Sequence, residues 1–193
     1  MIPDRRLFML FSNTISYYYP PDVLAFYEFQ NDFRTLMEKR RKKTQPLVIV
    51  CIGTDRATGD CLGPLVGQYL QNHCLSSTDC TIYGCLSNPV HAQNLHETIK
   101  KIETSHEQPF IIAIDACLGC REHVGYITLS PLPLFPGQGV SKDLPPIGNI
   151  SITGIVNHTS HSNEEMIQNT RLQIVVELAS FISSGIEHLC CPY

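Results

Sequence analysis

The sequence predicts an α/β fold, a three-layer α/β/α sandwich built around a mainly parallel sheet. Residues 47–52 form a nearly unbroken apolar run rich in β-branched side chains, which is typical of a strand buried on both faces of a parallel sheet. Further along the chain, strand-like apolar runs alternate with segments of helical periodicity. This alternation is the order that builds a parallel sheet covered by helices.

Length and composition limit the classes of protein to consider. With 193 residues, 43% hydrophobic and 17% charged, the chain is long enough for one domain with a sizeable core. The formal net charge of −4 gives no general attraction to nucleic acid or acidic membranes, so we expect neither as a partner. No stretch approaches the roughly 18 apolar residues of a membrane span, and no export signal is evident. Nine cysteines without regular spacing favour reduced thiols in the cytoplasm.

The first part of the chain, residues 1–45, is expected to be an extension that packs on a core domain over residues 46–193. Residues 1–21 give no clear pattern. Residues 22–43 carry a helical stripe of apolar positions, with Asp22 as the expected cap and basic residues that suit the helix C-terminus. This helix is expected to pack outside the sheet, and its apolar side could serve a homodimer as readily as the core.

The elements after the first strand follow from the same periodicities. Strands are predicted at residues 81–86, 110–114, 124–129 and 149–156, and helices begin at Pro64, near Leu95 and at Asn163. The strand at 124–129 is expected at an edge or as an antiparallel addition, because few residues separate it from the preceding strand. The last helix is predicted to run unbroken over residues 163–189. Residues 131–148 form a long loop rich in proline and glycine, and such loops are usually functional or mobile.

Two aspartates are expected at the carboxyl edge of the sheet. Asp60 follows the first strand, just before the helix that begins with Pro64, and Asp115 follows the strand at 110–114. In open α/β sheets ligands bind beyond this edge, and neighbouring strands would bring the two carboxylates together. Such a pair shares one proton, so the charged member can activate a water while the neutral one protonates or polarises a carbonyl. The alternative is that Asp60 only caps a helix and Asp115 only ends a strand.

Other polar residues near this edge give weaker signals. Thr54 and Asp55, in the loop after the first strand, are candidate substrate-binding residues. Asp55 and its neighbour Arg56 could orient a substrate, or they could form a loop ion pair of little consequence. His91, after the second strand, is a candidate for an accessory role, although a structural histidine is an equal alternative.

Metal, redox and nucleotide sites have little support. His158 and His161 could join the carboxylates at a metal, but their spacing matches no known zinc motif. Cys117 and Cys120 form a single Cys-x-x-Cys without the second pair that a zinc site needs. The glycines after the first strand do not follow the nucleotide-binding spacing. We therefore predict no metal and no cofactor.

Several segments resemble the YyaC family of sporulation proteins (DUF1256). The resemblance covers residues 44–186 and is carried by VCIGTDRATGDCLGPLVG at 50–67, NPVHA at 88–92, FIIAIDACLG at 110–119, PGQGV at 136–140, ITGIV at 152–156 and QNTRL at 168–172. That family resembles germination protease and, more distantly, the hydrogenase maturation endopeptidases. The resemblance implies their phosphorylase/hydrolase-like α/β/α fold, places aspartates of germination protease at Asp60 and Asp115, and makes Gly137 and Gly139 substrate-side residues.

The resemblance also implies a function. It predicts a sporulation-associated endopeptidase in the forespore cytoplasm of a spore-forming bacterium, which cleaves a protein or peptide with a water activated by the aspartate pair. The alternative is a non-catalytic sporulation protein that binds a peptide or partner in the same crevice. Hydrogenase maturation enzymes hold a metal with two acidic residues and a histidine before the fifth strand. Residues 131–148 contain no histidine, which argues against a metal-dependent reaction.

Overall fold

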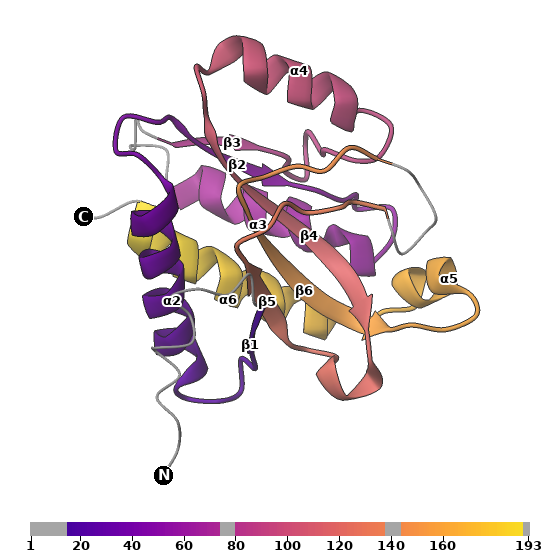
Figure 1. Cartoon of the computed structure of the whole chain (residues 1–193). Helices are drawn as coiled ribbons and strands as arrows, with labels where there is room; N and C mark the ends of the chain where they lie inside the picture. Colours follow the sequence, from indigo (N-terminus) through magenta and orange to yellow (C-terminus); the bar gives the residue numbers. More distant parts are fainter. Residues whose placement is uncertain (1–14, 74–79, 138–143, 191–193) are drawn as a thin grey trace.

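A twisted sheet of six strands lies at the centre of the structure (Figure 1). The computed structural model describes residues 15–73, 80–137 and 144–190. The strand order is β1-β5-β6-β4-β2-β3, and β2, β3, β4 and β6 are parallel. The bounds are β1 (Ser16–Tyr18), β2 (Leu47–Cys51), β3 (Cys80–Tyr83), β4 (Phe110–Gly119), β5 (Ile127–Ser130) and β6 (Ile150–His158). The predicted mainly parallel sheet is confirmed.

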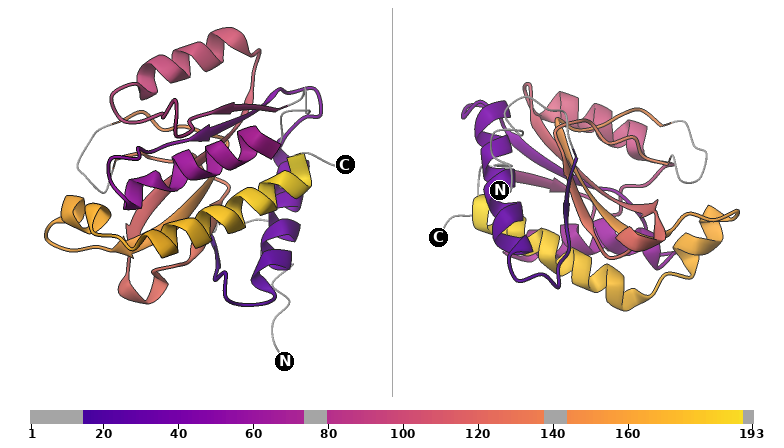
Figure 2. Two further views of the ribbon diagram at one scale, coloured as in Figure 1. Left: turned by 180° about the vertical axis from the view of Figure 1, so that it is seen from behind. Right: turned by 60° about the horizontal axis from the view of Figure 1, so that its bottom comes forward.

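Helices cover both faces of this sheet, as the sequence predicts for a three-layer sandwich (Figure 2). One face carries α2 (Ala25–Arg40), α3 (Leu62–His73) and α6 (Leu172–Cys190). The opposite face carries α4 (Leu95–Ser105), which packs over β2 and its neighbours. Within the described ranges, no helix is long and apolar enough to cross a membrane.

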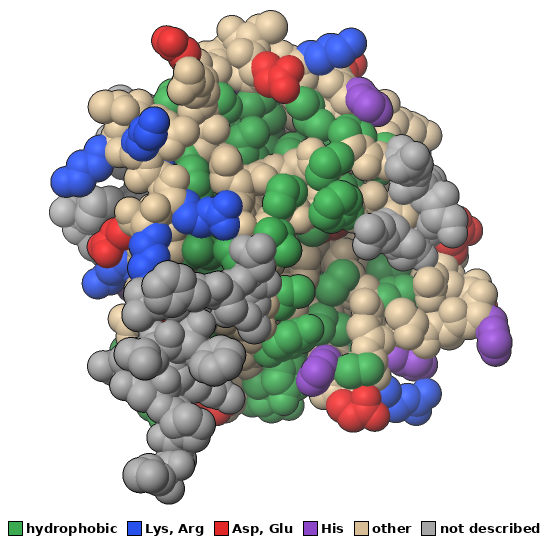
Figure 3. Space-filling view, viewed as in Figure 1, with side chains coloured by type: hydrophobic (Ala, Val, Ile, Leu, Met, Phe, Trp, Pro, Cys, Tyr) green, Lys and Arg blue, Asp and Glu red, His purple; other side chains and the backbone are tan. Residues whose placement is uncertain are grey.

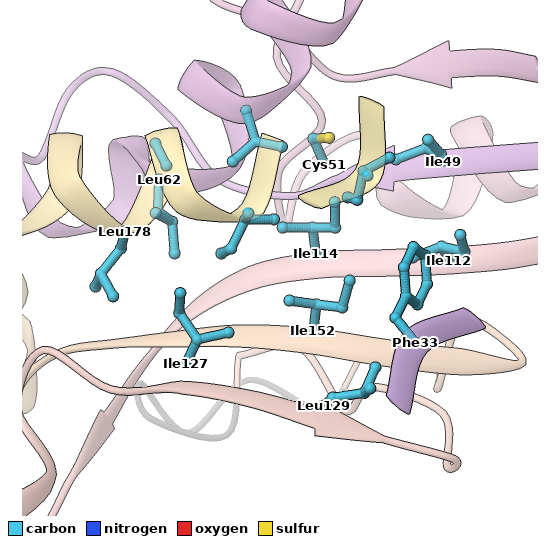
Figure 4. Packing of buried hydrophobic residues seen from close by; sticks show 14 of the residues in the cluster. Phe33, Ile49, Cys51, Leu62, Ile112, Ile114, Ile127, Leu129, Ile152 and Leu178 are labelled. Atoms are coloured by element: carbon cyan, nitrogen blue, oxygen red, sulfur yellow. The ribbon is translucent and has the colours of Figure 1, made fainter. Parts of the chain in front are cut away.

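Strand β2 shows why its sequence is almost wholly apolar. Ile49 and Cys51 point into the larger core beneath α2, α3 and α6, where Figure 4 shows them among the packed side chains. Val48 and Val50 point to the other face and pack with α4. Side chains alternate between the two faces of a strand, so a strand with helices on both sides needs apolar residues at every position.

The antiparallel position of β5 is confirmed, but its place at the edge is not. β5 pairs antiparallel with β6, and its other side pairs with β1. The short strand β1 therefore forms this edge of the sheet. Residues 1–21, which contain β1, show no clear pattern in the sequence, because three residues are too few to show an alternation.

The prediction of one helix over residues 163–189 is wrong, because the chain breaks between α5 (Asn163–Gln168) and α6. The carbonyl oxygen of Met166 accepts hydrogen bonds from the side chains of Thr170 (2.8 Å) and Asn157 (3.0 Å). The Met166 carbonyl thus accepts side-chain donors, whereas in a continuous helix it would accept a backbone N–H. Asn157 belongs to β6, so these bonds also hold α5 against the end of that strand.

The N-terminal helix begins later than predicted and packs on the sheet face. α2 starts at Ala25, and Asp22 does not cap it; its carboxylate accepts the backbone N–H of Leu24 at 3.0 Å instead. Phe29 and Phe33 on this helix are completely buried in the larger core. The helix is therefore integrated with the sheet and α6.

Candidate active site

The loop that carries Asp60 is held close to the end of β2 by the way α3 rests on the sheet. A Cβ atom at Gly63 would lie 2.0 Å from the carbonyl oxygen of Ile52, so only glycine lets the helix backbone approach this closely. Asp60 itself lies in the short 3-10 helix η1 (Gly59–Cys61), directly before α3. Gly53 has a φ of +137°, a conformation that leaves room for the loop leading to η1. The backbone N–H of Thr54 donates to the Asp60 carbonyl oxygen at 3.1 Å.

Asp115 lies inside β4 rather than in a turn after it, which corrects the predicted end of this strand. Its neighbour Ile114 pairs with the last residue of β2, Cys51. β4 then continues beside β6 alone, and Asp115 lies opposite Thr153 in the register. Because β2 ends here, the side chain of Asp115 stands at the boundary between the covered and the open part of the sheet face.

Both aspartates line one pocket of about 840 Å³. Its floor is the sheet face formed by β4, β6 and β5, beyond the area that α4 covers. One wall is residues 132–137, and the other is formed by η1 and α5. In Figure 3, hydrophobic side chains gather across this face of the molecule. The structure thus brings the two predicted residues to one site, although they come from segments 55 positions apart.

The two carboxylates interact electrostatically, and the charge of Asp60 acts on the pKa of Asp115. Burial raises the pKa of Asp115 well above its ordinary value, and the negative charge of Asp60 raises it further. The backbone N–H of Ala116, which donates to Asp115 Oδ1 at 2.8 Å, opposes this shift. Asp115 is thus the member of the pair that holds a proton more strongly than a free aspartic acid does.

A row of hydroxyl groups on the pocket floor was missed by the sequence reasoning. Thr128 on β5 and Thr153 on β6 lie opposite each other, with their hydroxyl oxygens 2.6 Å apart. The thiol of Cys117 on β4 donates to Thr153 at 3.3 Å. The sequence does carry a signal for this row. Both ITLS at 127–130 and ISIT at 150–153 alternate apolar and small polar residues, which places the polar residues of each strand on one face.

This row carries one more donor hydrogen than its internal hydrogen bonds use. Cys117, Thr128 and Thr153 carry three donor hydrogens, and the two bonds among them use two. One hydroxyl hydrogen, on Thr128 or Thr153, is left for a partner outside the row. Both threonines line the pocket, so this hydrogen is available to an acceptor such as a carbonyl oxygen of a ligand.

The structure places only some of the other predicted substrate-binding residues at the pocket. His91 and Gly137 line the pocket, and the ring of His91 accepts the backbone N–H of Gln93 at 3.3 Å. Thr54 and Asp55 lie in the loop before η1 and are not among the residues that line the pocket. Gly139 lies outside the described residues, so its predicted role stays a prediction.

The donor set does not fit a metal held by two acidic residues and a histidine. In the part of the chain that the structure describes, no three histidine, cysteine, aspartate or glutamate side chains come together as a metal site. His158 is bonded to Asn157 at 3.0 Å and to Arg121 at 3.2 Å. It does not line the pocket, and neither does His161. We therefore derive no step through a metal.

The two cysteines of the Cys-x-x-Cys sequence are free thiols in different surroundings. Cys117 faces the pocket and bonds to Thr153, and its burial raises the pKa to about 11. Cys120 is exposed and lies 3.1 Å from Nδ1 of His123. Cys117 lies in the extended strand β4 and Cys120 directly after it, and the two thiols bond to different side chains. A redox pair of the thioredoxin type lies at the start of a helix instead.

Comparison with known proteins identifies the family. The sequence profile described as "Protein of unknown function (DUF1256)" matches residues 17–185. The chain belongs to this family. Within the known proteins, "Uncharacterized protein YyaC" of Bacillus subtilis (strain 168) is 46% identical over 147 residues, which are 76% of this chain and 71% of YyaC. The predicted resemblance to the YyaC family is thus confirmed.

A similarity in fold is also found among solved structures. The [NiFe] hydrogenase maturation protease HycI from Thermococcus kodakarensis KOD1 has a TM-score of 0.49 to this chain, with 15% sequence identity. The match covers 79% of this chain and 99% of HycI.

Proposed function

We propose that this DUF1256 chain is a peptidase that hydrolyses a peptide bond with a water activated by Asp60 and Asp115. One observation carries the proposal: two carboxylates from η1 and β4 line the same pocket, and burial and mutual charge raise the pKa of one of them. Carboxylates whose environments differ in this way can act as base and acid in one reaction.

The proposed reaction divides the work between the two aspartates. Asp60, as the ionised member, accepts a proton from the water while the water oxygen attacks the carbonyl carbon of the peptide. Asp115, as the protonated member, gives its proton to the amide nitrogen as the C–N bond breaks. The products are a carboxylic acid and an amine, and passage of the proton from Asp60 to Asp115 restores the starting state.

The Thr128 and Thr153 pair has a supporting role in this proposal. Both threonines line the pocket, and Thr153 lies opposite Asp115 in the strand register, so the remaining hydroxyl hydrogen can be donated to an acceptor beside Asp115. A substrate carbonyl oxygen that accepts this hydrogen would be held near the acid, and the bond would strengthen as negative charge develops on the oxygen. The threonines are fixed on adjacent strands, so the donor is positioned before the substrate arrives.

The second candidate function is binding without catalysis. The pocket also contains large apolar side chains that are partly exposed, Leu132 and Phe135, and these favour a bound polypeptide whether or not it is cleaved. For both functions the proposed setting is the forespore cytoplasm during sporulation. This setting is supported by the family resemblance alone.

Peptidase activity against denatured small spore proteins and spore-coat proteins tests the proposal. The wild type is compared with Asp60→Asn and Asp115→Asn, and Asp55→Asn is the matched control because it changes an aspartate outside the pocket lining. The expected result is cleavage by the wild type and control that persists with EDTA and falls at least about 100-fold in each pocket variant.

Two results would contradict this mechanism. Cleavage that disappears with EDTA would show that a metal is needed. If the folded wild type cleaves none of these proteins, the catalytic proposal fails and binding becomes the better description. Circular dichroism of each variant shows whether a loss of cleavage arises from unfolding.

A further inference from the structure

The proposed reaction needs Asp60 and Asp115 at a fixed separation, and the two residues reach the pocket on different elements. Asp115 is fixed inside β4, where it lies opposite Thr153 of β6 in the register. Asp60 lies outside the sheet, in the short helix η1. When two groups act on one substrate, a misplacement of about 1 Å can lower the rate roughly 100-fold. The contacts that hold η1 against the sheet therefore bear directly on the reaction.

On one side, η1 rests on the junction between α5 and α6. A Cβ atom at Gly59, the residue before Asp60, would lie 2.7 Å from the carbonyl oxygen of Ile167 and 2.9 Å from the hydroxyl oxygen of Thr170. The backbone of η1 therefore lies directly against the end of α5 and the Thr170 side chain. A shift of this junction would move Asp60 with it.

The side chain of Asn157, on β6, ties this junction to the sheet. Its Nδ2 donates to the carbonyl oxygen of Met166 at 3.0 Å and to the Thr170 hydroxyl at 3.4 Å. The Thr170 hydroxyl donates to the same Met166 carbonyl at 2.8 Å. The Asn157 Oδ1 accepts the backbone N–H of His158 at 2.9 Å and its ring Nδ1–H at 3.0 Å. The amide thus uses both donor hydrogens and both acceptor positions, which fixes its orientation.

Helix α5 depends on these bonds because it buries little of its own surface. None of its six residues is buried, and Glu164, Glu165 and Gln168 are exposed. In Figure 1 it projects from the body of the molecule at the end of β6. A helix this short has little stability of its own in water. Its position is therefore set by Ile167, which packs partly against the larger core, and by the hydrogen bonds at its C-terminal end.

We propose that Asn157 and Thr170 are positioning residues, which hold Asp60 at its working distance from Asp115. The connection runs from Asn157 through Thr170 to the backbone of Gly59, and so to Asp60. Asn157 belongs to β6, the strand that pairs with Asp115 on β4, so the same two strands carry both ends of the connection. The positioning role rests on the proposed function and adds the residues that set its geometry.

Two uncharged substitutions of similar shape break this connection. Thr170→Val removes the hydroxyl and Asn157→Leu removes the amide, and neither adds a charge that would itself shift a pKa. Thr170→Ser keeps the hydroxyl and is the conservative variant expected to restore wild-type behaviour. Thr104→Val on α4 is the matched control. The Thr104 hydroxyl also donates to a helix carbonyl, that of Lys100 at 3.0 Å, but it is exposed and does not line the pocket.

The first measurement is the pKa of Asp115, followed by the ¹³C NMR signal of its side-chain carboxyl carbon over a pH titration. The charge of Asp60 raises this pKa in the wild type. Two carboxylates repel each other, so a released η1 is expected to move away from β4 and the pKa to fall. We expect this fall in Thr170→Val and Asn157→Leu, and wild-type values in Thr170→Ser and Thr104→Val.

The same titration in an Asp60→Asn background shows whether the effect passes through Asp60. No charge is left at that position to be displaced, so Thr170→Val and Asn157→Leu should then leave the pKa of Asp115 unchanged. A pKa that is unaltered by both substitutions in the wild-type background would overturn the positioning role. So would a fall that is equally large with and without the Asp60 carboxylate, because loss of burial alone would explain it.

The second measurement is steady-state cleavage of the proteins that test the proposed function. Thr170→Val and Asn157→Leu should lower kcat roughly 10- to 100-fold with little change in KM, because the strands that form the pocket floor are retained. Thr170→Ser and Thr104→Val should match the wild type. A kcat that is unchanged in both disrupting variants, or lowered equally by Thr170→Ser, would contradict the positioning role.

Failure of the proposed function is distinguishable from failure of the positioning role. If the folded wild type cleaves no protein, the peptidase proposal fails, and the Asp115 titration still decides whether Asn157 and Thr170 position Asp60. Circular dichroism shows which variants are folded at the temperature of measurement. Where Asn157→Leu does not fold, the comparison of Thr170→Val with Thr170→Ser decides.

Discussion

Replacing Asp115 by asparagine is expected to make the folded protein more stable at neutral pH, although it removes a proposed catalytic group. The Asp115 side chain is only 8% exposed, and burial and the charge of Asp60 raise its pKa well above 3.8. An acid with a raised pKa binds its proton more tightly in the folded than in the unfolded state, so stability falls as the pH rises. Asparagine removes the charge, and its Oδ1 can still accept the Ala116 N–H.

The magnitude follows from this linkage. The gain in the free energy of unfolding is expected to be near zero below about pH 4, to increase by up to about 1.4 kcal/mol per pH unit, and to become constant above the raised pKa. Urea unfolding of the wild type and Asp115→Asn at several pH values measures it. In an Asp60→Asn background the gain should become constant at a lower pH, because the repelling charge is absent. A difference that does not change with pH, or an Asp115→Asn variant that is less stable at neutral pH, would refute the reasoning.

Three further predictions concern packing and thiol reactivity. Gly63→Ala is expected to destabilise by about 1–3 kcal/mol, because the new methyl group would meet the carbonyl oxygen of Ile52 at 2.0 Å; an unchanged Tm would contradict this. Phe33→Ala is expected to cost about 3–5 kcal/mol in urea unfolding, since the ring is fully buried; a loss below about 1 kcal/mol would show that the core closes over the gap. At about pH 8, iodoacetamide should modify Cys120 well before Cys117, of which only about one thiol in a thousand is ionised at a pKa of about 11; equal rates by mass spectrometry would contradict the burial of Cys117.

The parallel core of the fold could be predicted because its strands are buried on both faces. In β2, Ile49 and Cys51 pack on one side and Val48 and Val50 on the other, and this leaves a continuous apolar run in the sequence. β1 gave no such signal, because three residues between exposed ends show no period. The break before α6 was missed because one of the two side chains that bond to the Met166 carbonyl, that of Asn157, comes from a distant strand.

The candidate site was predictable where it depends on position along a strand, and not where it depends on contacts between strands. Asp60 and Asp115 follow apolar runs, and in an α/β fold this places them at the same edge of the sheet. The pairing of Thr128 with Thr153 depends on the register of β5 and β6, which one sequence does not specify. The wall at Phe135 depends on the bonds between Leu134 and Ile147, two residues that only the folded chain brings together.

The pair of aspartates is therefore positioned by the backbone, and this has a consequence for how variants should behave. β2 ends at Cys51 while β4 continues, so Asp115 is buried by its own sheet and still faces the pocket. Asp60 reaches the same pocket because Gly63 lets α3 rest on the end of β2. Gly63→Ala should then lower the proposed activity even at temperatures where the protein stays folded, because it shifts η1 relative to β4. Phe33→Ala, on the opposite side of the sheet, should lower stability and leave the activity of the folded fraction unchanged.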